Sequence, residues 1–317
     1  MKPSTLAFIL FSPTLLFAEK FPMTMELDWK PNVQFAGILL AQEKGWYDEA
    51  GLEVTIPKFD TEKDIVARVA ASDNTIGSSE SGVLLRERHK GAKIKAIGTM
   101  FQGSPLSFIS LKTSNLTKVA DLNGKKIGLH SDTPKVLEVI FNYNKITDYQ
   151  VYPVIVGYQM EELKTGKVDA AQGYLIDEAV MLQTQGVEIN VIPVVENGYS
   201  AYSQTFFVSE DFIAKHPGQI KKFLEVTFRG WREAFAHPEA TAKLVIEKFY
   251  PEGTLAYQTE SLRKIEKLMT LENPEIGQMR RETWQASIDM FLLYKIGETP
   301  KTADEILDFQ FLNAIYP

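Results

Sequence analysis

The strongest constraint on how this chain can fold is a change in its residue pattern near residue 209. Before that point, short apolar segments typical of strands alternate with segments of helical periodicity, starting at residue 22. After it, nearly every segment has the helical pattern. Alternating strands and helices indicate an α/β fold, and the helical tail must pack onto it because an apolar helix face needs a partner.

The length of the chain sets the number of domains that we expect. The sequence has 317 residues, which suits two domains of about 150 residues each. We predict two α/β lobes, with the helical tail folding back on the first lobe and making it discontinuous. The predicted first lobe comprises residues 19–106 and 203–317, and the second comprises residues 107–202. The two crossings would form a hinge near residues 104–108 and 199–205.

Individual elements follow from the apolar patterns and from the glycine and proline residues that separate them. Strands are expected at residues 23–27, 52–56, 74–78, 94–101, 108–111, 125–129, 151–156, 168–174, 189–195 and 204–208. Helices of the tail are expected at residues 218–236, 238–249, 256–270, 278–293 and 303–314. A capping-box pattern at residues 61–64 predicts one helix start, and residues 79–82 predict another.

Residues 1–18 have the composition of a signal peptide. Lys2 supplies a short positive region, residues 6–17 are largely apolar, and Ala18 is a small residue at the expected cleavage position. The apolar run is too short to span a bilayer stably, so an uncleaved anchor is the lesser alternative. The chain contains no cysteine, which excludes lipid attachment through an N-terminal cysteine. We therefore expect an exported protein that is free in the periplasm.

Composition excludes several classes of function. A chain without cysteine cannot form disulfides, zinc-thiolate sites, iron-sulfur clusters or a cysteine nucleophile. Its four histidines lack metal-ligand spacing, and the common hydrolase, phosphate-loop and dinucleotide motifs are missing from the sequence. The formal net charge of −7 argues against a nucleic-acid partner. We predict a protein that is not an enzyme and that has no metal, no cofactor and no catalytic residues.

The segment from Asp28 to Gly51 has the pattern of a ligand-binding loop followed by a helix. Its first part is short and polar and follows a strand pattern; its second part has an apolar helix face. Asn32 is placed to cap the helix start, and Gly45 to end the helix in a left-handed turn. Open α/β sheets bind ligands in loops of this kind, at the carboxyl ends of strands.

Three segments resemble one family. They are DWKPN at residues 28–32 with AQEKGWY at 41–47, DLNGKKIG at 121–128, and GKVDAAQGY at 166–174 followed by Glu178. These segments resemble the substrate-binding proteins for thiamine pyrimidine precursors, which belong to ABC importers and are related to fungal thiamine-pyrimidine synthases and to sulfonate and riboflavin binders. The resemblance covers essentially the whole chain after residue 18.

The resemblance implies a two-lobed periplasmic-binding-protein fold of type II, with capture of a small aminopyrimidine by hinge closure. It also implies an ABC permease in the inner membrane as partner, and we expect a monomer. Residues 33–35 and 177–179 depart from the usual family pattern at the presumed ligand. A riboflavin or sulfonate binder, a periplasmic sensor subunit and a synthase remain as alternatives. The synthase is disfavoured because the fungal enzymes carry a cysteine-rich segment, whereas this chain has no cysteine and begins with the pattern of an export signal.

The expected ligand contacts centre on two aromatic side chains and one carboxylate. The resemblance implies that Trp29 and Tyr174, from the two lobes, sandwich a flat heteroaromatic ring. Glu178 is expected to accept hydrogen bonds from the exocyclic amine and a protonated ring nitrogen. The alternative for Glu178 is a solvated position in a first helical turn, where acids are favoured. Asp28 and Asp177 are interpreted as caps or hinge contacts.

Further candidates lie at helix starts and in the crossings. Ser79 and Ser131 precede helices whose free N–H groups could bind an anionic or formyl oxygen, although simple capping is the alternative. Glu80, between two serines, is a candidate carboxylate. Asn32 and Gln102 carry amides that could orient a polar ring edge. Tyr202, like Tyr199, lies in the second crossing and could close over the ligand, or else pack in the hinge.

Overall fold

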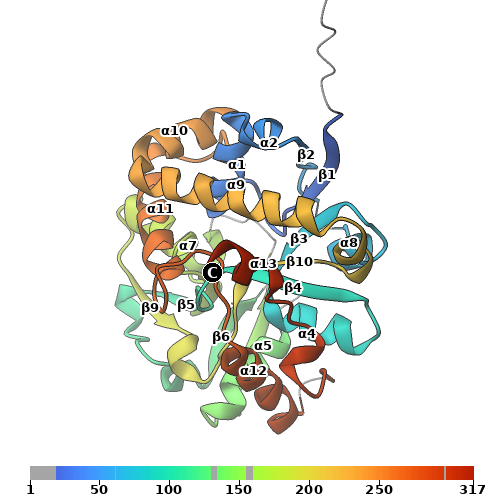
Figure 1. Ribbon diagram of the computed structural model, residues 1–317. Coiled ribbons are helices and arrows are strands. Elements are labelled where there is room, and N and C mark those ends of the chain that lie inside the picture. Colours follow the sequence, from blue (N-terminus) through green and yellow to red (C-terminus); the bar gives the residue numbers. More distant parts are fainter. Residues whose placement is uncertain (1–18, 61, 130–133, 155–159, 296–297) are drawn as a thin grey trace, which may run out of the picture.

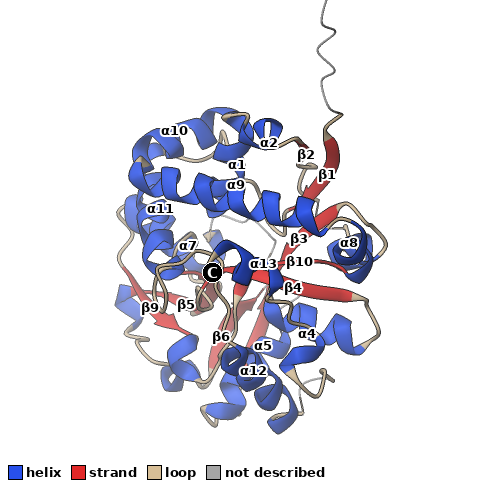
Figure 2. Ribbon diagram, in the orientation of Figure 1, coloured by secondary structure: helices blue, strands red, loops and turns tan. Residues whose placement is uncertain are grey.

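A computed structural model describes residues 19–60, 62–129, 134–154, 160–295 and 298–317, and Figures 1 and 2 show its two sheets surrounded by helices. The first sheet has five strands in the order β2-β1-β3-β10-β4. Strand β1 pairs in parallel with β2 and β3, whereas β10 runs antiparallel to β3 and β4. The strands are β1 (Phe21–Glu26), β2 (Leu52–Thr55), β3 (Thr75–Ser79), β4 (Ile94–Phe101) and β10 (Ser203–Ser209).

The second sheet also has five strands, in the order β7-β6-β8-β5-β9. Strand β6 is parallel to β7 and β8, and β5 is antiparallel to β8 and β9. The strands are β5 (Leu106–Leu111), β6 (Lys125–Leu129), β7 (Tyr149–Pro153), β8 (Ala170–Tyr174) and β9 (Ile189–Pro193). The chain crosses between the sheets after β4 and again before β10. The predicted division into lobes follows these crossings, and we retain its boundaries as a proposal.

Helices cover both sheets (Figure 2). They are α1 (Ala36–Glu43), α2 (Trp46–Glu49), α3 (Ile65–Ala70), α4 (Ser81–His89), α5 (Pro134–Tyr143), α6 (Glu161–Lys164), α7 (Glu178–Thr184), α8 (Glu210–Lys215), α9 (Pro217–Ala236), α10 (Pro238–Lys248), α11 (Leu255–Met269), α12 (Arg281–Leu293) and α13 (Gln310–Ile315). Helices α1 and α9 pack so closely that a Cβ atom on Gly230 would lie 2.0 Å from the Gly37 carbonyl oxygen. Glycine at this crossing therefore sets the distance between the two helices.

The tail returns to the first sheet, as predicted. The Ala96 amide of β4 donates to Ile306 O at 2.8 Å, and the Asp308 amide donates back to Ala96 O at 3.0 Å. This pairing covers part of the β4 edge, which would otherwise present unpaired backbone groups. Helix α12 also reaches the second lobe, because its Met290 and Phe291 join the apolar cluster that contains Phe108 and Ile127.

Several local predictions are confirmed and others are wrong. The Asn32 side chain caps the 3₁₀ turn η1 (Val33–Phe35), and Gly45 has a left-handed φ of 69°. The capping box at residues 61–64 is wrong in its capping residue, because Asp64 caps α3 by accepting from Ala67 N; residue 61 lies outside the described residues. The helix predicted at residues 303–314 is broken, because residues 306–308 pair with Ala96 instead.

Candidate functional site

The two sheets are joined by a hydrogen bond between Tyr174 and Glu80. Tyr174 ends β8, and its hydroxyl donates to Glu80 Oε1, while Ser203 Oγ donates to Glu80 Oε2 at 2.7 Å. Glu80 occupies the N-cap position of α4 but makes no capping bond with its side chain. Its carboxylate is therefore directed to the second lobe and to β10 rather than to its own helix.

Acidic side chains influence the protonation of the Tyr174 hydroxyl. Burial raises the pKa of Tyr174 well above its ordinary value, and the charges of Glu80, Asp28 and Glu178 raise it further. Glu178 Oε2 also accepts from the Tyr174 backbone amide at 2.7 Å. Tyr174 consequently remains a protonated hydrogen-bond donor to Glu80.

A second contact between the lobes joins Asn32 and Asp177. Asn32 Oδ1 accepts from Gln34 N at 2.8 Å, and its Nδ2 donates to Asp177 Oδ2 at 3.2 Å. Burial and the charge of Glu178 raise the pKa of Asp177 well above its ordinary value, while Asn32 and Lys30 oppose that rise. The Asn32–Asp177 contact thus holds a carboxyl group that retains its proton at a higher pH than an exposed aspartate does.

Asp28 follows β1 and contributes a further buried acid. Burial raises the pKa of Asp28, and the nearby Ser78 hydroxyl partly offsets this rise. Among the described residues, neither Asp28 Oδ1 nor Ser78 Oγ has a hydrogen-bond partner of good geometry. Such a carboxyl group has unused accepting capacity. A ligand that donates hydrogen bonds would meet it at the carboxyl end of β1, where ligands of open α/β sheets bind.

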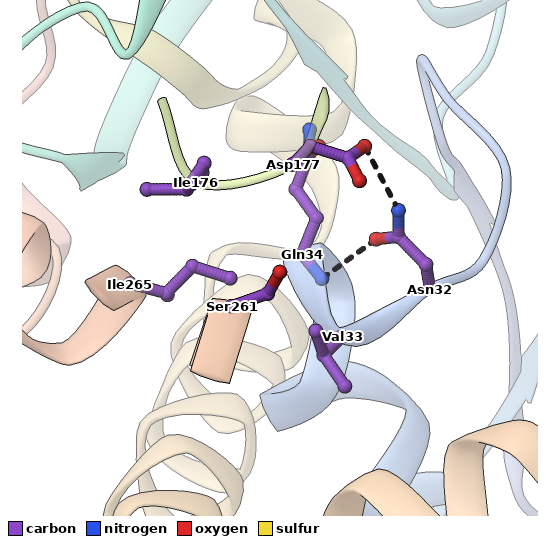
Figure 3. A pocket seen from close by; sticks show the side chains of 7 residues that line it. All are labelled: Asn32, Val33, Gln34, Ile176, Asp177, Ser261 and Ile265. Carbon is purple, nitrogen blue, oxygen red and sulfur yellow. Dashed lines mark hydrogen bonds between the residues drawn. The ribbon is translucent and has the colours of Figure 1, made fainter. Parts of the chain in front are cut away.

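A small cavity lies beside the Asn32–Asp177 contact (Figure 3). Its gaps are too narrow for a water molecule. Residues of both lobes form its walls: Asn32, Val33, Gln34, Ile176, Asp177, Ser261 and Ile265. Its width is therefore set by how closely the two lobes approach.

The structure places the remaining predicted residues as follows. Trp29 is half-buried in the loop after β1, and its ring lies 5.8 Å from that of Phe59. The sandwich of Trp29 and Tyr174 around a ring stays a prediction. Ser79 is the last residue of β3 and not a helix-start residue, because α4 begins at Ser81. Ser131 lies outside the described residues.

Gln102 and Tyr202 have partners that give them structural roles. Gln102 Nε2 donates to Asn273 O at 2.8 Å, and its Oε1 accepts from the amides of Glu272 and Asn273. The Tyr202 hydroxyl accepts from Arg280 N at 3.0 Å, and its ring is almost fully buried. Both side chains bond to the returning tail, and their roles as ligand contacts stay predictions.

Sequence reasoning missed several residues of this region. Ser203 and Gln204 begin β10, and Gln258 and Ser261 lie on α11. Gln204 Nε2 donates to Gln34 O at 2.5 Å, and Gln258 Oε1 accepts from Val33 N at 3.0 Å, so both position the η1 turn. Their positions in strand and helix patterns gave no signal, because each contact joins residues far apart in the chain.

Comparison with known proteins decides the family. Residues 32–241 match the protein family described as NMT1/THI5 like. The chain belongs to the NMT1/THI5-like family. The matched region includes Asn32, Glu80, Tyr174 and Asp177, whereas Ser261 lies beyond it.

Relatives of this NMT1/THI5-like protein carry different functional names. Riboflavin-binding protein RibY of Chloroflexus aurantiacus is 28% identical over 252 residues, covering 76% of this chain and 71% of RibY. The formylaminopyrimidine-binding protein of Halalkalibacterium halodurans is 23% identical over 289 residues, covering 88% and 87%. A 4-amino-5-hydroxymethyl-2-methylpyrimidine phosphate synthase of Legionella pneumophila is 22% identical over 233 residues, covering 72% and 74%.

Solved structures confirm the expected fold. The periplasmic aliphatic sulphonate binding protein SsuA of Escherichia coli has a TM-score of 0.72 at 12% identity, covering 91% of this chain and 92% of SsuA. The two-lobed periplasmic-binding-protein fold is therefore confirmed for this NMT1/THI5-like chain. Among the described helices, none has the length and apolar character needed to cross a membrane. The described residues also contain no group of side chains suited to hold a metal ion.

Proposed function

We propose that this protein is an exported solute-binding protein of an ABC importer that captures a small heteroaromatic amine between its lobes. The ligand that we propose is a pyrimidine precursor of thiamine, such as the hydroxymethyl or formylamino compound. The names of the pyrimidine-related relatives support this ligand. Its partners would be the ligand and an inner-membrane permease, and the protein would act as a periplasmic monomer.

The observation that carries the proposal is that Tyr174 binds two carboxylates, Glu80 through its hydroxyl and Glu178 through its backbone amide. The groups that shift the pKa of Tyr174 are all acidic. Such a site favours a ligand that carries a protonated ring nitrogen or an exocyclic amine, because a carboxylate accepts both as charge-assisted hydrogen bonds. A sulfonate would meet repulsion from these carboxylates.

Ligand capture would use the contacts that join the lobes. Separation of the lobes would break the Tyr174–Glu80 and Asn32–Asp177 hydrogen bonds and open the space between them. The ligand would then stabilise the closed arrangement by its higher affinity for that arrangement. Trp29 and Tyr174 would contact the faces of the ring, and Glu178 would bind its amine edge.

The second candidate ligand is riboflavin. RibY has the highest identity among the relatives described above, and its name identifies a flavin ligand. A flavin is larger than an aminopyrimidine and has no exocyclic amine. It would therefore need a wider opening of the lobes and would leave the carboxylates without cationic partners.

A calorimetric and thermal-shift panel tests the proposal. The compounds are hydroxymethyl- and formylamino-pyrimidine, thiamine, riboflavin, pyridoxal phosphate and an alkyl sulfonate. A ligand at a hundred times its Kd adds about 2.7 kcal/mol to the free energy of unfolding. We expect a selective shift with the pyrimidines. A shift with riboflavin alone would replace the pyrimidine with the flavin, and pyrimidine formed from pyridoxal phosphate would indicate a synthase.

A matched pair of variants tests the role of Glu178. Glu178→Gln keeps the size of the side chain but removes its charge, so we expect it to weaken pyrimidine binding. Glu161→Gln is the control, because Glu161 is a first-turn acid of α6 in the same lobe that pairs with Lys164. Equal affinities of both variants and the wild type would exclude Glu178 from the ligand site.

A further inference from the structure

Ser261 presents a hydroxyl group that the fold itself does not use. The residue is 2% exposed, and its Oγ has no hydrogen-bond partner among the described residues. Most buried hydroxyl groups in proteins are hydrogen-bonded, because an unpaired one loses its interactions with water. Ser261 lines the cavity beside the Asn32–Asp177 contact, and Figure 3 shows its oxygen pointing toward Gln34 and Asp177.

The other walls define which chemical group would fit next to this hydroxyl. Asn32 and Asp177 bind each other, and Asn32 also binds Gln34 N. Val33, Ile176 and Ile265 supply apolar surface. A single available hydroxyl among apolar side chains suits a small, uncharged substituent with one oxygen. An ionised group would be poorly solvated there.

The position of the cavity links it to the proposed ligand site. Ser261 and Ile265 come from α11, and Val33 comes from the η1 turn, all in the first lobe. Ile176 and Asp177 come from the segment between β8 and α7, next to Tyr174 and Glu178. Movement of that segment away from α11 would widen the cavity toward the carboxylates. The gaps do not admit a water molecule as the lobes now stand, so a substituent could enter only after this movement.

We propose that Ser261 is a specificity-determining residue that binds the oxygen of the ligand's side substituent, a hydroxymethyl or formylamino group. This inference rests on the proposed function, because it requires a pyrimidine in the cleft. Ser261 selects between ligands with and without this oxygen, while Glu178 and the aromatic side chains bind the ring that both ligands share.

The test compares two ligands that differ by one oxygen. These are 4-amino-5-hydroxymethyl-2-methylpyrimidine and the analogue with methyl at position 5. We expect the wild-type chain to prefer the hydroxymethyl compound about fivefold to tenfold, the effect of one hydrogen bond. Ser261→Ala should reduce this preference to about one while leaving the Kd of the methyl analogue unchanged.

Thr259→Val is the matched control. Thr259 lies on the same helix, and its hydroxyl is likewise buried and lacks a hydrogen-bond partner in the described part of the chain, but it does not line the cavity. The preference for the hydroxymethyl compound should persist in this variant. An unchanged preference in Ser261→Ala, or an equal loss for both ligands, would overturn the assignment while the proposed function stands. Failure of the wild type to bind either pyrimidine would overturn both.

A cysteine variant provides a second readout that does not depend on affinity. The chain has no cysteine, so Ser261→Cys introduces a unique thiol. We expect a small thiol reagent to modify it when the lobes separate, and the hydroxymethyl compound to slow the reaction. Thr259→Cys is the control. Equal protection of both thiols by the ligand would indicate general closure rather than contact at Ser261, and would count against the proposal.

Discussion

At the scale of single residues, the surroundings of Asp177 oppose the ionisation of its carboxyl group. The pKa of Asp177 is raised well above 3.8 by burial and by Glu178. Between pH 3.8 and the folded-state pKa of Asp177, the folded protein therefore binds more protons than the unfolded protein. The contribution of Asp177 to stability is fully present below pH 3.8 and is lost as the pH rises through the folded-state pKa.

Replacing Asp177 with asparagine should remove this pH dependence. We expect the free energy of unfolding of Asp177→Asn to increase relative to wild type as the pH is raised from about 4 to 7. Urea unfolding at a series of pH values measures the difference. Asp121→Asn is the control: backbone amides lower the pKa of Asp121, so the difference between this variant and the wild type should stay constant from about pH 4 to 7 and change only below about pH 4. A difference for Asp177→Asn that is constant across the pH range would contradict the assignment.

Removing the Tyr174 hydroxyl should weaken ligand binding by disfavouring closure. Tyr174→Phe keeps the ring but loses a hydrogen bond to a charged group, an interaction of roughly 1.5–3 kcal/mol. We expect affinity for the ligand to fall at least about tenfold in calorimetry. Tyr47→Phe is the control, because Tyr47 binds Thr227 Oγ1 at 2.7 Å within one lobe. Equal affinities of the two variants would argue against a hinge-closing role for Tyr174.

At the scale of elements, the position of the site depends on how α1 and α9 pack. The η1 turn that carries Asn32 leads directly into α1, and α1 rests on α9 through Gly37 and Gly230. A shift of this helix pair would move Asn32 relative to Asp177. The close approach of α1 and α9 thus supports the Asn32–Asp177 contact with the second lobe.

Substitution of Gly230 by alanine should destabilise the fold. The added methyl group would lie 2.0 Å from the Gly37 carbonyl oxygen, so the helices must separate. Overpacking of this kind costs about 1–3 kcal/mol, which thermal unfolding would detect. Gly218→Ala is the control on the same helix, since no atom lies within 4 Å of its added Cβ. Similar melting temperatures for the two variants would show that the crossing tolerates a side chain.

At the scale of the whole molecule, polar contacts between the lobes complement the apolar core. Tyr174 binds Glu80, Asn32 binds Asp177, and Lys264 of α11 donates to Gln183 of α7 at 3.2 Å. The larger apolar cluster also continues from the first sheet onto residues of the second lobe, including Met160 and Val180. In the proposed function, closure would involve these hydrogen bonds as well as the apolar contacts.

Exchanging the amide of Asn32 and the carboxylate of Asp177 in two steps should first impair closure and then restore it. Asn32→Asp keeps a side chain that caps the η1 turn but places a second carboxylate against Asp177. We expect a larger radius of gyration by small-angle X-ray scattering and at least tenfold weaker ligand binding. Adding Asp177→Asn should restore both, because the amide and the carboxylate have only exchanged places. A double variant as impaired as the single one would exclude this contact as a determinant of closure.

The sequence by itself determined the alternation of strands and helices, the capping of the η1 turn by Asn32 and the left-handed turn at Gly45, because these depend on neighbouring residues. The resemblance carried by the segments around Trp29 and Tyr174 led to the family and the two-lobed fold. Only the tertiary structure decided the partners of the site residues. Glu80 meets Tyr174 across 94 positions, and Asn32 meets Asp177 across 145.

The same distinction explains the predictions that failed and the residues that were missed. The predicted helix is interrupted at residues 306–308 because Ile306 O and Asp308 N form hydrogen bonds with Ala96 of β4. The hydrogen bonds of Gln102 to Glu272 and Asn273 also join residues far apart in the chain, and its role as a ligand contact stays a prediction. Ser261 has an ordinary helix position in the sequence. Its significance arises only because the second lobe closes a cavity over it, and no local pattern records where a distant segment will pack.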